Sequence, residues 1–415
     1  MQHSKIITGL DIGTSKITTI LGQYFEQEDK LNIIAASSIP ATGFKKGQII
    51  NLEQACETIT QSVESAERMA GFQINQISVA ITAPHIESVN SKGVVGISNP
   101  NGEIDTNDIN RAIEAAKAIS LPAGKEILHV IPRIFTVDGQ EGIIDPIGMN
   151  GVRMEIEAHL VIASSPAIKN LQKCLEEIGL KITDLTYSGF VAAKASLTET
   201  EKDLGVALVD IGGSNTTITL FIEGSPAYSH VLPIGANNIT NDIAIGLRQN
   251  IEDAEKIKLK LAKIYDNKKF TDEIDLSHFG IPSNNSKISI QTTVNGIIKP
   301  RLEELFSLIK EKIEDSSYAK NIPAGIVLTG GGALTVNTKE VCQKVINLPV
   351  RIAEPKQIGG IIDDISNPAY SSSIGLLLSA LENNQKSNFS LNPKNKISIK
   401  GIFGKIKHLI EPLLP

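Results

Sequence analysis

The sequence has no tryptophan, only 4% aromatic residues and only three cysteines in 415 positions. With a formal net charge of −6, it offers neither the basic surface nor the aromatic platforms expected of a nucleic-acid-binding protein, so we expect no nucleic acid as a partner. No stretch reaches the roughly 18 consecutive apolar residues of a membrane-spanning helix. The composition, 41% hydrophobic and 21% charged, is that of a globular protein, and the length predicts about two to three domains.

The cysteines and histidines form no recognisable metal or disulfide pattern. Cys56, Cys174 and Cys342 are far apart and no pair has CxxC spacing, which favours buried, reduced thiols. The seven histidines show no ligand spacing either. The N-terminal residues carry no apolar signal region, so we expect a reducing cytoplasm as the compartment.

One short pattern occurs twice, about half a chain apart. In each copy an apolar run meets an aspartate, turns through glycine and hydroxyl residues, and resumes with alternating β-formers. Counted from Asp11 and from Asp210, both copies have Ile at +1, Gly at +2, Ser at +4 and Thr at +7. The pattern predicts two β-hairpins of one kind.

The chemistry of these turns points to phosphate. Glycine lets the backbone approach a ligand, so that consecutive N–H groups converge on an anion. Hydroxyls and Lys16 add donors and a positive charge. Asp11 and Asp210 would suit a hydrated Mg²⁺, which keeps several waters and takes few carboxylate ligands. An ordinary tight hairpin explains either copy alone, but it does not explain two copies with matched offsets.

Two further features lie in the second half of the chain. A glycine cluster at 330–332 ends another apolar strand, and in α/β proteins ligands sit at the carboxyl ends of strands. Apolar residues at helical spacing predict a helix from Ile251 to about Tyr265. Glu255 and Lys258 share a face of that helix, where a surface ion pair is the alternative to a role in binding.

In this order, the two hairpins, the late glycine strand and the intervening helix resemble the actin-like ATPase superfamily, which also holds heat-shock chaperones and sugar kinases. Within it, the chain is similar to the bacterial cell-division family FtsA. The most specific stretch runs from Leu128-His129-Val130-Ile131-Pro132-Arg133 to Gly151-Val152-Arg153-Met154. Lys202–Gly205 and Ile298–Leu305 are similar too, and the resemblance extends from about residue 6 to 380.

The resemblance implies an α/β, actin-like two-lobed fold with repeated five-stranded cores around a nucleotide cleft. A small inserted α+β module and a C-terminal amphipathic helix would complete it. The implied ranges are 1–82, 164–196 and about 360–382 for the first lobe core, 83–163 for the module, 197–235 and 306–359 for the second lobe core, and 236–305 for a small subdomain. Short alternating strands around one helix near 107–119 agree with such a module.

The resemblance also implies ATP and Mg²⁺ as cofactors in the cleft. The first phosphate loop would comprise Asp11, Gly13, Thr14, Ser15 and Lys16. The second would comprise Asp210, Gly212, Gly213, Ser214, Asn215 and Thr216. Asp11 and Asp210 would hold Mg²⁺ through water. Gly330, Gly331 and Gly332 would border the adenosine, whose ribose and base edge Glu255 and Lys258 would contact.

One departure from the superfamily concerns hydrolysis. Members that hydrolyse ATP well have a glutamate, in a Glu-Pro pair before an alanine-rich helix, that positions the attacking water. Ser188 stands there in this sequence, and a neutral hydroxyl is a poor base. We therefore expect weak or no ATPase activity, no catalytic residue, and a mainly structural adapter.

The C-terminal residues change in composition twice. Residues 383–398 are polar and low in complexity, which predicts a disordered linker. The segment 399–415 then places apolar residues on one helical face and lysines on the other, as interfacial membrane-binding helices do. The predicted membrane residues are Ile402, Phe403, Lys405, Ile406, Lys407, Leu409 and Ile410.

Charge supports this prediction. From residue 394 onward, five lysines and one glutamate give the tail +4, which leaves −10 on the rest of the chain. Anionic lipid attracts such a tail by about 1 kcal/mol per lysine near the surface. A terminal helix that docks on its own protein is the alternative. The tail lacks the Trp and Arg of the family's usual ending, and the helix should end near Pro412. One tail would therefore bind only reversibly, and stable attachment would need several tails in one polymer.

The leading interpretation is a cell-division protein that binds ATP, self-assembles and tethers the FtsZ ring to the membrane, and recruits later division proteins. The resemblance implies a peripheral protein on the cytoplasmic face of the inner membrane, at the septum. Arg301 would contact the acidic FtsZ tail, unless it only pairs within its own helix. A pilus-assembly actin homologue lacks the basic tail and the 128–154 signature. A small-molecule kinase is a weaker alternative, because no catalytic aspartate is evident.

Overall fold

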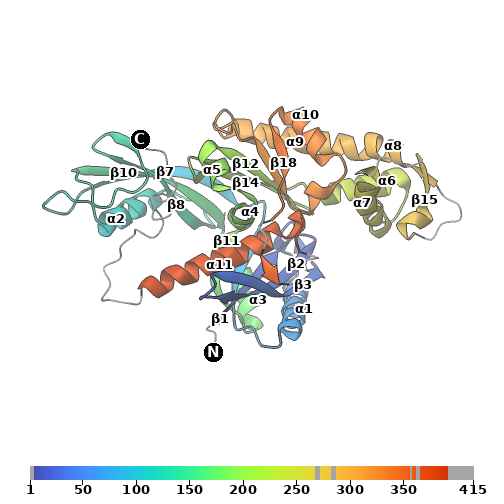
Figure 1. Cartoon of the computed structure of the whole chain (residues 1–415), viewed down its shortest axis with the longest axis horizontal. Helices are drawn as coiled ribbons and strands as arrows, with labels where there is room; N and C mark the ends of the chain where they lie inside the picture. The colour runs from blue at the N-terminus through green and yellow to red at the C-terminus, as the bar shows by residue number, and fades with distance from the viewer. Residues whose placement is uncertain (1–3, 267–271, 282–286, 356–357, 361–364, 391–415) are drawn as a thin grey trace.

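Two sheets with the same core strand order form the framework of the molecule, one below the other in Figure 1. The computed structural model describes residues 4–266, 272–281, 287–355, 358–360 and 365–390. The long helix α11 (Ser371–Ser390) crosses between the lobes in the same view.

The first sheet has six strands in the order β11-β6-β1-β2-β3-β19. Three consecutive strands are antiparallel because short turns join them, whereas β6 and β11 follow helices and run parallel to β1 and to β6 respectively. The strands are β1 (Ser4–Ile12), β2 (Lys16–Phe25), β3 (Lys30–Pro40), β6 (Gln76–Ile81), β11 (Lys181–Tyr187) and the short edge strand β19 (Gly359–Gly360).

The second sheet repeats this arrangement in the order β18-β17-β12-β13-β14. Again three consecutive strands are antiparallel and two parallel strands extend one side. The strands are β12 (Val206–Ile211), β13 (Thr216–Ile222), β14 (Ser225–Leu232), β17 (Ile326–Thr329) and β18 (Val350–Ile352). The predicted pair of five-stranded cores is confirmed, with β19 as an added edge.

The inserted module extends the second sheet, although the chain enters it from the first lobe. Its strands β7 (Glu87–Gly96), β10 (Arg153–Ser164), β8 (Lys125–Val137) and β9 (Gln140–Ile143) continue the sheet from β14 through a pair between His230 and Glu87. Helix α2 (Thr106–Lys117) covers these strands and starts with a capping box at Asp105. The module therefore contacts both lobes.

A buried polar network holds the module against the second lobe. His159 of β10 contacts Asn90 Oδ1 through Nδ1 at 2.7 Å and Ser229 Oγ through Nε2 at 3.0 Å. The Asn90 amide also donates to the Tyr318 hydroxyl at 3.0 Å. Arg133 of β8 donates to that same hydroxyl at 3.2 Å. The network joins three strands of the module to residues on β14 and beyond α9.

Helices pack against both sheets. In the first lobe these are α1 (Leu52–Ala70), α3 (Ser165–Glu177), α4 (Ser188–Ser196) and α11. In the second they are α5 (Glu199–Leu204), α9 (Lys299–Asp315) and α10 (Thr338–Ile346). The small subdomain holds α6 (Ala236–Leu247), α7 (Ile251–Asp266), α8 (Ile290–Thr293), the π-helical turn η2 (Val294–Ile298), and the strands β15 (Glu273–Asp275) and β16 (Lys287–Ser289).

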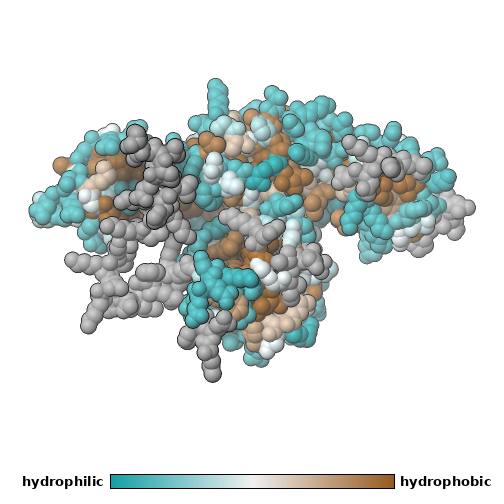
Figure 2. Space-filling model, viewed as in Figure 1, coloured by the Kyte–Doolittle hydropathy of each residue, from teal (hydrophilic) through white to brown (hydrophobic). Residues whose placement is uncertain are grey.

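The apolar stripe predicted for residues 251 to about 265 is confirmed as helix α7. Ala254, Ile257 and Leu261 are fully buried and belong to the largest apolar cluster of the second lobe. Burying each of the two larger side chains contributes about 1.5–3 kcal/mol to folding. On the face shown in Figure 2, hydrophobic residues gather in patches among largely hydrophilic residues.

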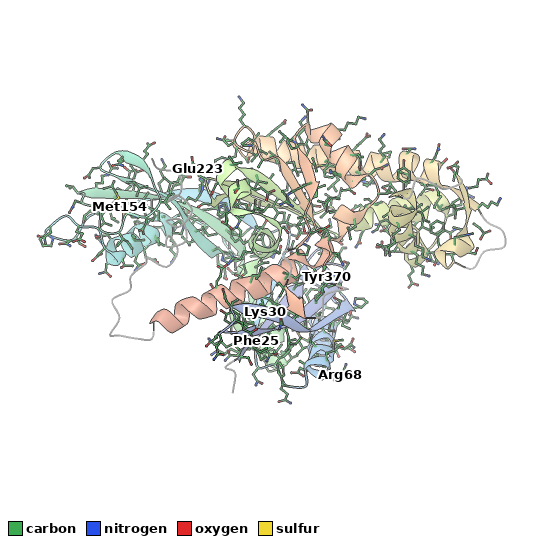
Figure 3. All side chains as sticks on the ribbon, in the orientation of Figure 1. Phe25, Lys30, Arg68, Met154, Glu223 and Tyr370 are labelled. Atoms are coloured by element: carbon green, nitrogen blue, oxygen red, sulfur yellow. A yellow bond between two sulfur atoms is a disulfide. The ribbon has the colours of Figure 1, made fainter. Side chains whose placement is uncertain are left out.

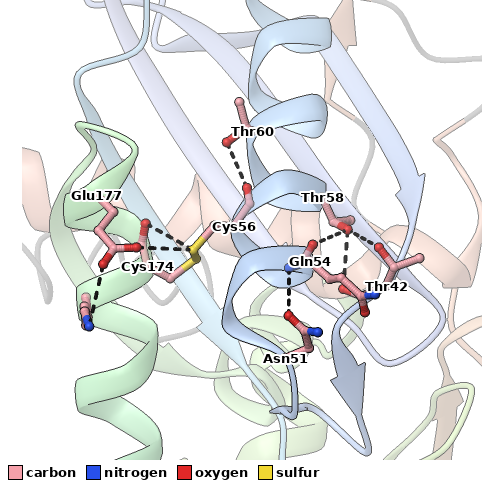
Figure 4. The surroundings of a disulfide bond; sticks show 9 residues. Thr42, Asn51, Gln54, Cys56, Thr58, Thr60, Cys174 and Glu177 are labelled. Carbon is pink, nitrogen blue, oxygen red and sulfur yellow. Dashed lines mark hydrogen bonds and ion pairs between the residues drawn. A yellow bond between two sulfur atoms is a disulfide. The ribbon is translucent and has the colours of Figure 1, made fainter.

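The cysteines are arranged differently from the prediction. Cys56 of α1 and Cys174 of α3 are paired as a disulfide, with Cα atoms 5.5 Å apart (Figure 4). The expectation of reduced thiols is wrong for this pair, because two helices that are 118 residues apart in sequence pack side by side on the first sheet. Cys342 is free and buried as expected, and burial raises the pKa of its thiol to about 12.

Helix α11 reaches further than the composition suggests. It continues to Ser390, so the predicted disordered linker is wrong over residues 383–390, which are helical. A polar composition did not prevent a helix that begins on a firmly packed apolar segment from continuing. The rest of the linker and the predicted membrane segment 399–415 lie outside the described residues. Within the described part, no helix is long and apolar enough to cross a membrane.

Candidate functional site

Both predicted hairpins face one cleft between the lobes, with a volume of 1320 Å³. The β1–β2 hairpin comes from the first lobe and the β12–β13 hairpin from the second. Their registers match, because Asp11 pairs with Thr18 and Asp210 pairs with Thr217. The sequence repeat is therefore a structural repeat that presents equivalent positions from opposite sides.

Nearly all of the predicted cofactor residues line this cleft. The residues from the hairpins are Asp11, Gly13, Thr14, Ser15, Lys16, Asp210, Gly212, Gly213, Ser214 and Asn215, and those from the later elements are Glu255, Lys258, Gly330, Gly331 and Gly332.

Thr216 is the exception. Its side chain is fully buried, and its hydroxyl donates to the Ile234 carbonyl at 2.8 Å. Successive side chains of a strand point to opposite faces, so Thr217 lines the cleft instead. Thr18 lines it at the equivalent position of the first hairpin. The shared Thr at +7 in both copies was the signal that could have found these two residues.

The two phosphate loops contact each other directly. Ser214 donates its backbone N–H to the Thr14 hydroxyl at 2.8 Å. Gly213 lies so close to Ser15 that an added Cβ would stand 2.9 Å from the Ser15 Cβ, which explains glycine at this position. The Asn215 amide reaches the Lys46 carbonyl of the first lobe at 3.0 Å. The second loop thus packs directly against the first loop and its lobe.

The two aspartates lie in the interior of the cleft. Burial raises the pKa of Asp11, and burial together with the nearby charge of Asp11 raises the pKa of Asp210 to about 6. Two carboxylates that lose water and repel each other suit a divalent cation, which would neutralise both. Among the described residues, no group of three or more His, Cys, Asp or Glu side chains could hold a metal ion.

The third glycine segment packs against Asp210. Gly330 has a φ of +82°, and a Cβ there would stand 2.2 Å from Asp210 Oδ1. Only glycine allows this strand end to approach the carboxylate so closely. The following turn, η3 (Gly331–Leu334), borders the cleft.

Lys16 lies over an aromatic ring at the rim of the cleft. Its Nζ is 3.4 Å from the centroid of the Tyr370 ring, a cation–π contact. Tyr370 ends the short turn η4 (Pro368–Tyr370) directly before α11, and Figure 3 shows it between the two lobes. The contact positions a cation beside the first phosphate loop.

Glu255 and Lys258 both pair with each other and line the cleft. Lys258 Nζ lies 2.7 Å from Glu255 Oε2 and donates to the Thr240 hydroxyl at 2.9 Å. Sequence reasoning missed the apolar residues beside them. Ile251, Leu259 and Leu334 line the same end, although each is more than two-fifths exposed. This end of the cleft therefore combines an ion pair with open apolar surface.

Ser188 and Arg301 have partners within the chain. The Ser188 side chain is buried and bonds to the Thr82 hydroxyl, and it does not line the cleft, whereas Thr82 does. Arg301, at the start of α9, forms a two-pronged pair with Asp242, with Nε 2.5 Å from Oδ2 and Nη2 3.0 Å from Oδ1. It also lies 2.5 Å from Glu304. The alternative of an arginine that pairs within its own helix thus has a structural basis in Glu304, and Asp242 of α6 is a further partner.

Comparison with known proteins identifies the family. A model described as the SHS2 domain inserted in FtsA matches residues 83–162, and one described as cell division protein FtsA matches residues 207–375. The cell division protein FtsA of Pseudomonas aeruginosa is 36% identical over 386 residues, which cover 92% of this chain and 91% of that protein. That of Neisseria meningitidis serogroup B is 35% identical over 414 residues, 99% of both chains.

The chain belongs to the FtsA family of cell-division proteins. The matched module range nearly coincides with the one expected from the sequence. Because these relatives match along nine-tenths or more of the chain, the pilus-assembly and kinase alternatives are set aside.

Solved structures show that the FtsA-family chain has the actin-like fold. The PilM-PilN type IV pilus biogenesis complex matches with a TM-score of 0.63 and 16% identity, covering 90% of this chain and 98% of that one. MreB5 of Spiroplasma citri bound to ADP matches with a TM-score of 0.54 and 16% identity, covering 94% and 99%. A second structure of that MreB contains AMPPNP and has a TM-score of 0.53. At these identities the likeness shows the fold alone.

Proposed function

We propose that this FtsA-family chain binds ATP with Mg²⁺ in the cleft between its lobes. The observation that carries the proposal is the pair of matched hairpins, which present glycines, hydroxyls and carboxylates from opposite sides of one cleft. A volume of 1320 Å³ is large enough for a nucleotide. The MreB structures of the same fold hold ADP and AMPPNP, which agrees with this choice of ligand.

The phosphate end is the region between the two loops. Backbone N–H groups of the glycine turns, such as that of Ser214, and the hydroxyls of Thr14 and Ser15 donate to phosphate oxygens. Lys16 supplies a positive charge. Asp11 and Asp210 would hold the metal through water, and the metal would neutralise phosphate charge.

The adenosine end is the region between α7 and the turn η3. A purine base is flat and largely apolar, so the open surfaces of Ile251, Leu259 and Leu334 suit its faces. Glu255 accepts and Lys258 donates hydrogen bonds, as ribose hydroxyls and the base edge require. The internal pair of these two side chains keeps them in place before the ligand arrives.

Hydrolysis should be slow in this cleft. Ser188, at the position of the water-orienting glutamate, has a neutral hydroxyl and directs it to Thr82 rather than toward the cleft. We therefore propose that ATP acts as a structural ligand of assembly. Steady-state phosphate release by the pure protein should stay well below about one per second, and a faster rate would contradict this part of the proposal.

The binding test uses the full chain and a fluorescent ATP analogue, titrated with Mg²⁺ or with EDTA. We expect saturable binding that Mg²⁺ tightens. Asp210→Asn should lose most of the Mg²⁺ effect, and it should melt at a higher temperature without ligand, because it removes a buried charge beside Asp11. Asp145→Asn, an exposed aspartate of the module, serves as the control. Absence of binding by the unaltered chain would refute the proposal.

We further propose that the chain assembles with itself and tethers FtsZ to the cytoplasmic face of the inner membrane at the septum, where it recruits later division proteins. The +4 charge and the apolar spacing of the tail support binding to anionic lipid. Helix α11 extends to Ser390, and the rest of the predicted linker and the tail follow it in the sequence. Arg301 remains the proposed contact for the acidic FtsZ tail, in competition with Asp242.

A further inference from the structure

Three consecutive serines begin helix α11, and two of them contact the cleft aspartates. The Ser373 hydroxyl donates to Asp11 Oδ2 at 2.8 Å. The Ser372 hydroxyl donates to Asp210 Oδ2 at 3.1 Å. The third hydroxyl, that of Ser371, instead lies 2.7 Å from the Thr329 hydroxyl.

The two aspartates come from different lobes, yet one turn of one helix reaches both. Asp11 is the second-last residue of β1, and Asp210 is the second-last residue of β12. Successive residues of a helix project about 100° apart, so neighbouring serines can point to separate acceptors. The first turn of α11 is therefore the place where the carboxylates of both hairpins are held by one element.

Tight packing fixes this turn. A Cβ on Gly375, one turn further along α11, would stand 1.7 Å from the Val191 carbonyl oxygen, so the helix lies directly on the backbone of α4. On the other side, the Pro368 carbonyl before α11 accepts the Gly330 N–H at 3.1 Å. Ser373 is fully buried. The hydroxyls thus have little freedom to leave their carboxylates.

We propose that Ser372 and Ser373 are positioning residues for the metal of the cleft. Each hydroxyl occupies one carboxylate oxygen and fixes the rotation of the carboxylate, so that the other oxygen is presented to a metal-bound water. Partners that orient metal-ligand side chains affect metal affinity strongly, by 10–100-fold where the ligand is direct. This inference rests on the proposed function, because it names residues that prepare the same Mg²⁺ site.

The arrangement also links the site to the end of the chain. The first turn of α11 bonds to both carboxylates, and its last residue precedes the proposed membrane-binding tail. A metal held between the carboxylates would therefore restrain the helix at its cleft end. Slower amide hydrogen exchange over the first turns of α11 in the presence of Mg²⁺ and ATP is the expected sign.

The test measures the Mg²⁺ concentration that half-maximally tightens binding of a fluorescent ATP analogue to the full chain. Ser372→Ala and Ser373→Ala should each raise this concentration about five- to tenfold, while binding in EDTA stays within twofold. Ser371→Ala is the matched control, since its hydroxyl contacts Thr329 and neither aspartate. It should leave the Mg²⁺ requirement within twofold. Ser372 is partly exposed and Ser372→Thr keeps its hydroxyl. This variant should therefore need about the same Mg²⁺ concentration as the unaltered chain.

The outcomes separate this inference from the proposed function. If the unaltered chain binds the analogue with a clear Mg²⁺ requirement and both alanine variants keep that requirement, the positioning role is refuted and the nucleotide site stands. If Ser373→Ala does not fold, Ser373→Cys, which keeps a weak S–H donor at the same position, should show a smaller shift in the same direction. An unchanged Mg²⁺ requirement in that variant, with hydrogen exchange of α11 unaffected by Mg²⁺ and ATP, would also refute it.

Discussion

The Ser214 backbone N–H donates to the Thr14 hydroxyl across the cleft, at 2.8 Å, and so joins the two phosphate loops. In the proposed complex, this same Ser214 N–H is one of the groups that would donate a hydrogen bond to a phosphate oxygen. The proposed nucleotide binding would therefore exchange a bond between the lobes for a bond to the ligand. The net gain from each such hydrogen bond is small, about 0.5–1.5 kcal/mol, so we expect charge and metal to provide most of the affinity.

Thr216 and Thr217 form a matched pair of adjacent residues with different expected effects. Thr217→Val should weaken binding of the ATP analogue several-fold, because this side chain lines the cleft. Thr216→Val should leave binding unchanged and lower the free energy of unfolding by about 1 kcal/mol, because it removes a buried bond to the Ile234 carbonyl. Titration and chemical denaturation of both variants check this. Equal losses of affinity would contradict the assignment of faces.

His159 should make the stability of the chain depend on pH. Burial, with Arg133 and His129 nearby, lowers its pKa to about 3, against 6.5 when unfolded. As the pH falls below about 6.5, the unfolded chain binds a proton that the folded chain does not, so stability falls progressively down to about pH 3. The loss from this residue is about 2 kcal/mol at pH 5.

His159→Gln can still donate to Asn90 and accept from Ser229, and it does not titrate. Its unfolding free energy should therefore change less between pH 7 and pH 5 than that of the unaltered chain, by about 2 kcal/mol. His278→Gln, an exposed histidine, should leave the pH dependence as it is. Denaturant unfolding at both pH values gives the comparison. The same pH slope in all three proteins would show that His159 is not the group responsible.

Arg301 can be tested against its own partner, Asp242. If an acidic FtsZ tail binds Arg301, then Arg301→Gln should weaken binding of an FtsZ C-terminal peptide about tenfold, whereas Asp242→Asn should strengthen it, since the arginine loses its internal competitor. If Arg301 has only a structural role, both variants should bind the FtsZ peptide more weakly or with unchanged affinity. Arg68→Gln, on an exposed face of α1, is the control.

Removal of residues 400–415 should abolish co-sedimentation with anionic liposomes and leave nucleotide binding intact. The reason is the concentration of apolar residues and lysines in this segment. Lys405→Glu with Lys407→Glu, in the full chain, should reduce binding to anionic vesicles, and added salt should reduce binding of the unaltered chain. Continued pelleting of the truncated protein would contradict the assignment of the anchor.

Local patterns were enough to predict the elements of the cleft. The two hairpins, the glycine strand at 330–332 and helix α7 each follow from periodicities of two or 3.6 residues and from glycine at turns, which depend on neighbours in the chain. The same logic failed by one residue at Thr216, where the choice between two adjacent threonines depends on which face of β13 meets the cleft.

Contacts between distant segments were decided only by the tertiary structure. Ser373 and Asp11 are 362 residues apart, and Cys56 and Cys174 are 118 apart, so no local pattern connects them. The attachment of the module to the sheet of the second lobe also depends on contacts between distant segments, since the chain enters the module from the first lobe. The sequence by itself determined the strands, turns and charges, because these reflect short-range sterics and hydrophobic spacing. The packing of the lobes determined which hydroxyl holds which carboxylate, because that depends on the joint burial of surfaces from the whole chain.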